Sequence, residues 1–140
     1  RSKPITLVEV GVGGGGSLLM WADWLHPKSK IVGVDVNPPL KLDRNILVIQ
    51  ADATKSGVWL DQIGACDVVI DDGSHNPTDQ IATWELLWPR ITQGGLYIIE
   101  DIQNDQIAKQ LLALIPNSRE EDFRRIKGRY DDRIIWAKKV

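Results

Sequence analysis

Two segments of this sequence end in acidic residues directly after a short apolar run. The first is Val-Val-Ile-Asp-Asp-Gly-Ser-His at 68–75, and the second is Ile-Ile-Glu-Asp-Ile at 98–102. Such a run is typical of a buried parallel strand whose C-terminal end opens into a site. Neighbouring strands of this kind lie about 4.8 Å apart, so their carboxylates can converge on one divalent cation. His75 would lie beside that cation, where an imidazole can accept a proton.

A glycine-rich segment follows the first apolar run of the chain. Gly11, Gly13 and Gly16 match the spacing G-x-G-x-x-G, which allows unusual backbone torsions, close approach to a ligand and a helix N-terminus directed at it. Asp35 ends the next strand-like run roughly 20 residues on, where a carboxylate can hold both ribose hydroxyls of a nucleotide. The two features together favour a bound dinucleotide or S-adenosylmethionine over an empty glycine turn.

Three features separate these two ligands. Glu9 stands two residues before Gly11, where it would face the amino group of a methionine moiety but would repel a pyrophosphate. Asp52 ends the third strand-like run and is placed to accept a hydrogen bond from an adenine amino group. A reversed hairpin at the C-terminus is the third feature. With these features the sequence resembles the class I S-adenosylmethionine-dependent methyltransferases over essentially residues 5–139. The residues assigned to this cofactor are Glu9, Gly11, Gly13, Ser17, Asp35, Val36, Asp52, Ala53 and Asp71.

A narrower resemblance follows from the acidic motifs. Asp-Asp-Gly-Ser-His at 71–75, Trp-Pro at 88–89 and the run 94–102 are similar to the metal-dependent sugar O-methyltransferases of macrolide biosynthesis and to cephalosporin-hydroxylase-like proteins. The resemblance implies that Asp72, Glu100 and Asp101 bind Mg²⁺ and that His75 is the general base. It also implies a hydroxylated small molecule as substrate, such as a sugar or another natural product. Members of that family carry N-terminal helices that form a lid, which we expect this chain to lack.

The chemistry of methyl transfer fits these side chains. A neutral hydroxyl is a poor nucleophile, so a metal bound at Asp72 would lower its pKa and orient it while His75 removes the proton. Asp71 and Asp72 should point to opposite faces of the sheet, which gives Asp71 to the cofactor and Asp72 to the metal. By the same alternation, Glu100 and Asp101 share a metal only if the chain has begun to turn out of the strand.

The order of the elements predicts the fold class. Strand-like and helical segments alternate, which is typical of an α/β protein with a doubly wound, mostly parallel sheet of the Rossmann-like methyltransferase type. Asn76 and Pro77 are an expected N-cap and first residue of a helix. The expected strands are Ile5–Val10, Lys30–Val36, Ile46–Ala51, Asp67–Ile70 and Leu96–Ile99, and the expected helices are Ser17–Leu25, Pro77–Trp88 and a segment containing Ile107, Leu111 and Leu114.

Two connections depart from a regular alternation. Only Asn37–Asn45 separates the second and third strands, and a parallel crossover needs a dozen or more residues, so the helix there should be reduced or absent. At the C-terminus, Phe123–Lys127 and Arg133–Lys138 are strand-like runs joined by Gly128–Asp132. They predict a terminal hairpin whose last strand is antiparallel to the rest of the sheet.

Composition sets broader limits. The 140 residues are 43% hydrophobic with a net charge of −2, which predicts one domain spanning residues 1–140. No long basic run favours a nucleic acid, and no apolar stretch approaches the roughly 20 residues of a membrane-spanning helix. The single cysteine, Cys66, cannot form an internal disulfide, so a reducing cytoplasm fits. The sequence leaves the oligomeric state open, with a homo-oligomer among the alternatives.

Three alternative interpretations stay open. The glycine loop also allows an NAD-dependent oxidoreductase, although Glu9 and the acidic motifs disfavour it. A non-catalytic S-adenosylmethionine-binding module is compatible with the missing lid. The carboxylates after the strand at 68–71 could instead cap the following helix, a role open to Asp72 or Ser74.

Overall fold

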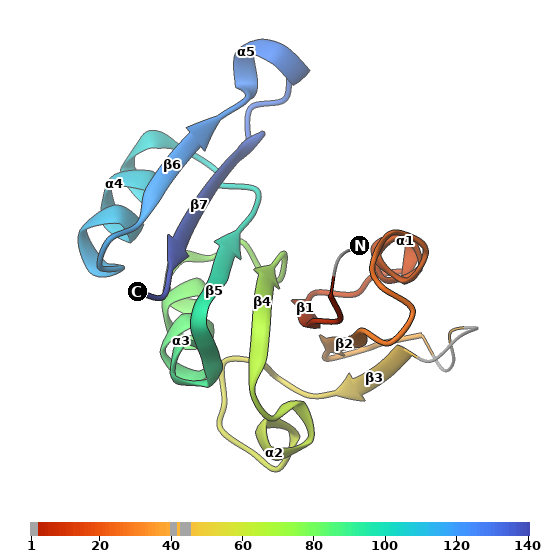
Figure 1. The fold of residues 1–140 in the computed structure, drawn as a ribbon. Coiled ribbons are helices and arrows are strands. Elements are labelled where there is room, and N and C mark those ends of the chain that lie inside the picture. The colour runs from red at the N-terminus through yellow and green to blue at the C-terminus, as the bar shows by residue number, and fades with distance from the viewer. Residues whose placement is uncertain (1–2, 40–41, 43–45) are drawn as a thin grey trace.

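The computed structural model describes residues 3–39, 42 and 46–140 and contains one seven-stranded sheet with the strand order β3-β2-β1-β4-β5-β7-β6 (Figure 1). The strands are β1 (Thr6–Val10), β2 (Lys30–Asp35), β3 (Ile46–Gln50), β4 (Cys66–Asp71), β5 (Ile91–Ile99), β6 (Arg119–Asp122) and β7 (Arg133–Lys138). The helices are α1 (Gly16–Trp24), α2 (Trp59–Ile63), α3 (Pro77–Leu87), α4 (Asp105–Leu114) and α5 (Arg124–Lys127), with a 3₁₀ turn at Trp88–Arg90.

The sheet confirms the predicted fold class. Strands β1 to β5 pair in parallel, β7 pairs antiparallel with β5, and β6 pairs antiparallel with β7. The strand order changes direction at β1, where β2 lies on one side and β4 on the other. Ligands of open α/β sheets bind at the carboxyl ends of the strands beside such a switch point. The fold therefore places the end of β1 where a ligand is expected.

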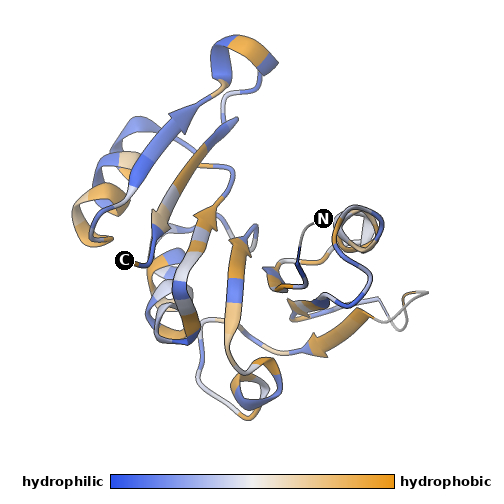
Figure 2. Ribbon diagram, viewed as in Figure 1, coloured by the Kyte–Doolittle hydropathy of each residue, from blue (hydrophilic) through white to orange (hydrophobic). Residues whose placement is uncertain are grey.

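The core explains why the strands are so apolar. Val8 and Val32, both fully buried, pack on one face of the sheet in the larger core, which also contains residues of α2, α3 and α4. Leu7 and Ile31 point to the other face and pack with Leu18 of α1. Figure 2 shows β4 as mostly hydrophobic and β6, at the sheet edge, as hydrophilic. Central strands covered on both faces need apolar residues at nearly every position, whereas an edge strand does not.

The start of α3 was predicted correctly. The Asn76 side chain accepts a hydrogen bond from the backbone N–H of Thr78 at 2.9 Å, and Pro77 is the first helical residue. Asn76, rather than Asp72 or Ser74, therefore caps the helix. The cap fixes where α3 begins and so fixes the short loop between β4 and α3 that carries His75.

The predicted strand at Phe123–Lys127 is wrong. Residues Arg124–Lys127 form the short helix α5, and the strand that pairs with β7 is the preceding Arg119–Asp122. The Asp122 carboxylate accepts from the Arg124 backbone N–H at 3.1 Å, which starts the turn, and Gly128 with φ +87° ends it. The four charged residues of β6 gave no apolar signal, because an edge strand does not need apolar residues along its length.

Two further details concern the connections. Helix α2 was not predicted as a separate element, since its five residues show too little periodicity. Between β2 and β3 the described residues 36–39 and 42 contain no helix, and the rest of that connection lies outside the described residues. In the part of the chain that the structure covers, no helix is long and apolar enough to cross a membrane.

Candidate functional site

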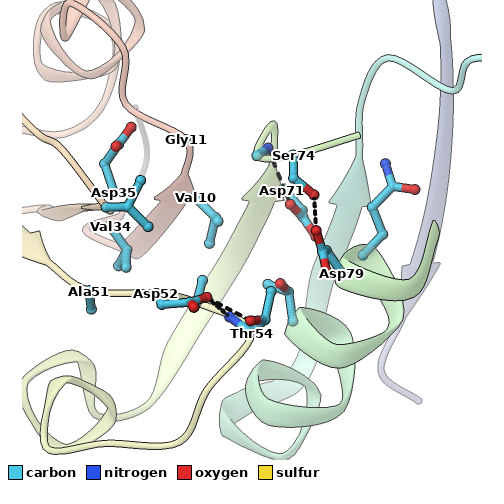
Figure 3. A pocket seen from close by; sticks show the side chains of 15 residues that line it. Val10, Gly11, Val34, Asp35, Ala51, Asp52, Thr54, Asp71, Ser74 and Asp79 are labelled. Atoms are coloured by element: carbon cyan, nitrogen blue, oxygen red, sulfur yellow. Dashed lines mark hydrogen bonds between the residues drawn. The ribbon is translucent and has the colours of Figure 1, made fainter. Parts of the chain in front are cut away.

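A pocket of about 250 Å³ opens at the carboxyl ends of β1, β2 and β4. Figure 3 shows Asp35 and Asp52 on one side of it and Asp71, Ser74 and Asp79 on the opposite side. A partly apolar pocket with aspartates on two opposite sides suits a ligand that carries several hydrogen-bond donors. The lining residues are Val10, Gly11, Val34, Asp35, Val36, Ala51, Asp52, Ala53, Thr54, Asp71, Gly73, Ser74, Asp79, Gln80 and Thr83.

Gly11 joins the glycine loop to the first acidic motif. Its backbone N–H donates to the Val34 carbonyl at 2.9 Å, and its φ is +84°. A Cβ atom at this position would lie 2.1 Å from the backbone oxygen of Asp72. Only glycine fits here, because a side chain would collide with the backbone at the end of β4. Gly13 also has a positive φ, +51°, but a Cβ there would meet nothing within 4 Å.

Asp35 holds the glycine loop in place as well as lining the pocket. One carboxylate oxygen accepts from the backbone N–H groups of Val12 at 2.7 Å and Gly13 at 3.2 Å, and the other accepts from Asn37 at 2.8 Å. Burial alone would raise the pKa of Asp35, but these backbone donors outweigh it and leave the pKa below its ordinary value. Asp35 is therefore an anion fixed at the pocket wall.

Asp52 lines the same pocket but has local partners. Its carboxylate accepts from the backbone N–H and the hydroxyl of Thr54, at 3.0 and 2.6 Å, and forms an ion pair with Lys55 at 2.7 Å. Hydrogen bonding from Lys55, followed by that from Thr54, lowers the pKa of Asp52 to about 2. Ala53 and Val36, also assigned to the cofactor, line the pocket beside it.

Three residues assigned to the cofactor lie outside the pocket lining. Gly13 shapes the loop, whereas Glu9 and Ser17 contact each other. The buried Glu9 carboxylate accepts from the Ser17 hydroxyl and from the indole N–H of Trp21, the latter at 3.1 Å. Burial raises the pKa of Glu9 despite these two donors. Its polar atoms thus join the end of β1 to helix α1.

The two acidic motifs meet beside this pocket. Asp72, His75 and Asp101 each offer one ligand atom, and these atoms lie within 4.8 Å of one another. His75 and Asp101 are two of the three non-glycine residues with positive φ in the described part of the chain, at +56° and +53°. Backbone strain of this kind is found mostly at functional sites. Glu100 and Asp101 were expected to share a metal only if the chain had begun to turn out of the strand. At Asp101 the chain has left the strand.

Glu100 lies at the flank of this cluster rather than within it. Its backbone N–H still donates to the Asp71 carbonyl at 2.9 Å, so it extends the pairing of β4 and β5. Burial, followed by the charges of Asp72 and Asp101, raises the pKa of Glu100. Burial and the charge of Asp101 raise the pKa of Asp72 in the same way. The carboxylates are close enough to repel one another.

Asp71 is almost fully buried and turned away from the cluster. It accepts from the Tyr97 hydroxyl at 3.1 Å, and burial raises its pKa to about 7. Sequence reasoning missed Tyr97, although its hydroxyl within an otherwise apolar strand was a signal, since a buried Tyr O–H usually has a partner. It also missed Asp79, which accepts from the Ser74 hydroxyl at 2.6 Å, and Arg129, whose guanidinium lies 3.7 Å from the Asp101 carboxylate.

Comparisons with known proteins find a matching family and several relatives. The family described as a methyltransferase domain matches residues 8–102. An 8-demethyl-8-alpha-L-rhamnosyl tetracenomycin-C 2'-O-methyltransferase of Streptomyces olivaceus is 35% identical over 114 residues, which are 74% of this chain and 30% of the relative. A mycinamicin VI 2''-O-methyltransferase of Micromonospora griseorubida is 37% identical over 114 residues, 73% of this chain and 28% of the relative. The chain thus spans less than a third of the length of these relatives.

Solved structures of methyltransferases and other proteins also superpose on this chain. The MycE methyltransferase from the mycinamycin biosynthetic pathway, in complex with Mg and SAH, superposes with a TM-score of 0.75 at 27% identity, over 99% of this chain and 46% of that one. A fibrillarin pre-rRNA processing protein of Methanococcus jannaschii superposes with a TM-score of 0.72 at 16% identity, over 95% of this chain and 65% of that one, which shows a shared fold only.

Proposed function

We propose that this chain, which belongs to the methyltransferase domain family, binds S-adenosylmethionine in the pocket at β1, β2 and β4 and transfers its methyl group to a hydroxyl of a glycosylated small molecule. The observation that carries the proposal is the cluster of Asp72, His75 and Asp101 directly beside that pocket. The relatives that this chain resembles are named as methyltransferases of rhamnosyl and mycinamicin substrates.

The pocket suits the proposed cofactor in two ways. Asp35 is a fixed anion at the end of β2, where a ribose diol can donate to it. Asp52 and its neighbour Ala53 lie at the end of β3, on the side where the adenine would bind. The pocket lining contains four aspartates and no lysine or arginine, which disfavours a pyrophosphate, because its negative charge would be repelled. This supports S-adenosylmethionine over NAD.

The acidic cluster fits a hard divalent cation. Mg²⁺ prefers carboxylate oxygens and binds through one or two of them, which Asp72 and Asp101 supply, with Glu100 next to them. When bound, the cation would polarise an acceptor hydroxyl and lower its pKa. Burial and mutual repulsion raise the pKa values of Asp72 and Glu100, so these carboxylates gain from a nearby positive charge.

His75 would take the acceptor proton in this proposal. Its Nδ1 atom is buried and has no hydrogen-bond partner among the residues that the structure describes. A buried ring nitrogen without a partner costs free energy unless something is bound there during function. We assign the hydroxyl proton to the His75 ring, through its other nitrogen, Nε2, and the cation to the carboxylates. Asp72 would then orient the acceptor, and most of the remaining rate gain would come from holding it in line with the methyl group.

Titration calorimetry tests the cofactor assignment. S-adenosylmethionine and its demethylated product should bind much more tightly than NAD. Asp35→Ala should weaken both by roughly ten-fold to a hundred-fold, since it removes a charge-assisted contact and loosens the glycine loop. Asp61→Ala, an exposed aspartate of α2, is the matched control and should bind normally. Tighter binding of NAD would refute the methyltransferase assignment.

Thermal unfolding tests the metal assignment. Millimolar Mg²⁺ should raise the melting temperature by mass action, and a chelator should reverse the shift. The triple variant Asp72→Asn, Glu100→Gln, Asp101→Asn should lose the response. A wild-type protein that shows no shift with Mg²⁺ would mean that the carboxylates do not form a metal site. Binding of the cofactor with a normal metal response but no methyl transfer would instead identify a non-catalytic module.

A further inference from the structure

A second pocket, of about 240 Å³, lies at the same edge of the sheet as the first. The end of β5 and the start of β7 meet there, because these two strands are antiparallel neighbours. The lining residues are Glu100, Asp101, Phe123, Lys127, Asp132, Arg133 and Ile134.

The carboxylate cluster stands between the two pockets. Asp71 and Gly73, on either side of Asp72 in the chain, line the first pocket, whereas Asp101 lines the second. Asp72, His75 and Asp101 bring their ligand atoms within 4.8 Å of one another, so Asp101 belongs both to the cluster and to the lining of the second pocket. A group held in the second pocket would therefore lie beside the cluster at Asp101.

Phe123, the N-cap residue of α5, and Lys127, the last residue of α5, both line this pocket. The Phe123 carbonyl accepts from the backbone N–H of Lys127 at 2.9 Å, which places these residues one helical turn apart. The Phe123 N–H donates to the Asp132 carbonyl at 2.8 Å, and this bond ties the start of α5 to β7. Ile126, on another face of the helix, is 82% exposed. The hairpin thus holds Phe123 and Lys127 over the pocket and leaves Ile126 in solvent.

The polar groups of this pocket differ in what they can still bind. The buried Arg133 guanidinium already has two carboxylate partners, because it donates to Asp105 at 2.7 Å and to Glu120. Lys127 forms no ion pair with any residue that the structure describes. The carboxylates of Glu100 and Asp101 accept no hydrogen bond from that same part of the chain. Asp101 forms only a long ion pair with Arg129, at 3.7 Å. Phe123 adds an apolar ring.

We propose that this second pocket binds the sugar ring of the acceptor, with its hydroxyls toward Glu100 and Asp101, its apolar C–H face on Phe123 and a ring or hydroxyl oxygen accepting from Lys127. A pyranose combines several hydroxyls with an apolar face, and this is the combination that the lining offers. Phe123 and Lys127 are then specificity residues. The inference rests on the proposed function, since it names the acceptor side of the same site.

Nuclear magnetic resonance of the ¹⁵N-labelled chain, saturated with SAH and Mg²⁺, tests the pocket without turnover. Methyl α-L-rhamnopyranoside is the probe, titrated to high millimolar concentration. Amide shifts should gather at Glu100, Phe123 and Lys127 and leave the β3–α2 connection, at residues 55–58, unchanged. The same spectra report SAH through the glycine loop, so failure of the cofactor assignment is seen separately. Shifts only elsewhere, or none at any concentration, would overturn the proposal.

Substitutions at Phe123 and within α5 make the test specific. Phe123→Ala should weaken the probe by roughly five-fold, the effect of a lost ring contact, and Lys127→Gln by a similar factor. Ile126→Ala and Arg125→Gln alter the same helix outside the pocket lining and should leave probe affinity unchanged. All four should bind SAH as the wild type does. If the control variants weaken the probe as much as Phe123→Ala, α5 matters only through its fold, and the pocket assignment is wrong.

Discussion

The two sides of the site are built in different ways. On the glycine-loop side, backbone groups satisfy the polar side chains, as where Asp35 accepts three backbone N–H groups and its pKa falls. On the acidic side, Asp72 and Glu100 have raised pKa values and the His75 Nδ1 atom lacks a partner among the described residues. The first side is complete before a ligand arrives. On the second side the carboxylates repel one another, so a bound cation would stabilise it.

The largest effect is expected at His75. His75→Ala should lower turnover by roughly 10²–10⁴-fold, the usual contribution of a positioned general base, while SAH affinity stays unchanged. His75→Gln can still hydrogen-bond but cannot take a proton, so it should be equally slow. His26→Ala, at the only other histidine, is the control. Initial rates with saturating S-adenosylmethionine, Mg²⁺ and a glycosylated acceptor measure the loss. Recovery of most of the rate by glutamine would make His75 a positioning residue.

A glycine substitution tests the other side of the comparison. Gly11→Ala places a Cβ 2.1 Å from the Asp72 backbone oxygen, so the loop or the end of β4 must move. We expect a loss of about 3 kcal/mol in the free energy of unfolding, together with weaker SAH binding. Gly13→Ala, at φ +51° with open space around it, should cost only about 1 kcal/mol. Chemical denaturation measures both, and equal losses would contradict the close approach at Gly11.

Asp71 should make stability depend on pH. Burial raises its pKa in the folded protein to about 7 from an ordinary 3.8, so the neutral side chain stabilises the fold fully below about pH 4. That contribution is lost as the pH rises through about 7. An asparagine side chain at this position would not titrate, so the wild type should lose roughly 2–4 kcal/mol relative to Asp71→Asn between pH 4 and 8. Denaturation in the presence of a chelator measures this difference. A pH-independent difference would mean that Asp71 is already ionised in the fold.

The smallest effect is expected at Arg129. Its guanidinium lies 3.7 Å from Asp101 and competes weakly with a cation for that carboxylate. Because the side chain is 65% exposed, its charge is screened, and Arg129→Gln should tighten Mg²⁺ binding by only about two-fold. Lys109→Gln, an exposed cation of α4, should change nothing. Calorimetric titration with Mg²⁺ measures both. Weaker binding in the Arg129 variant would show that this side chain supports the site instead.

Local sequence patterns determined much of this protein. The buried runs of β1, β2 and β4, the glycine loop and the cap at Asn76 each arise from residues close together in the chain, and each was predicted. The pairing of two acidic motifs also followed, because both end strands that had to be neighbours in a parallel sheet. The hairpin strand β6 was misplaced, since its charged residues carry no periodic signal.

The tertiary structure alone decided which side chains come together at the site. Positive φ at Asp101 turns its carboxylate toward Asp72 and leaves Glu100 beside the cluster, and φ is not encoded by residue type at an aspartate. Side chains of helix α1 donate hydrogen bonds to the Glu9 carboxylate. Strand β7 pairs with β5, although more than 30 residues separate them, and so carries Phe123 and Lys127 to the acidic edge. These placements depend on contacts between distant segments, which a local pattern does not specify.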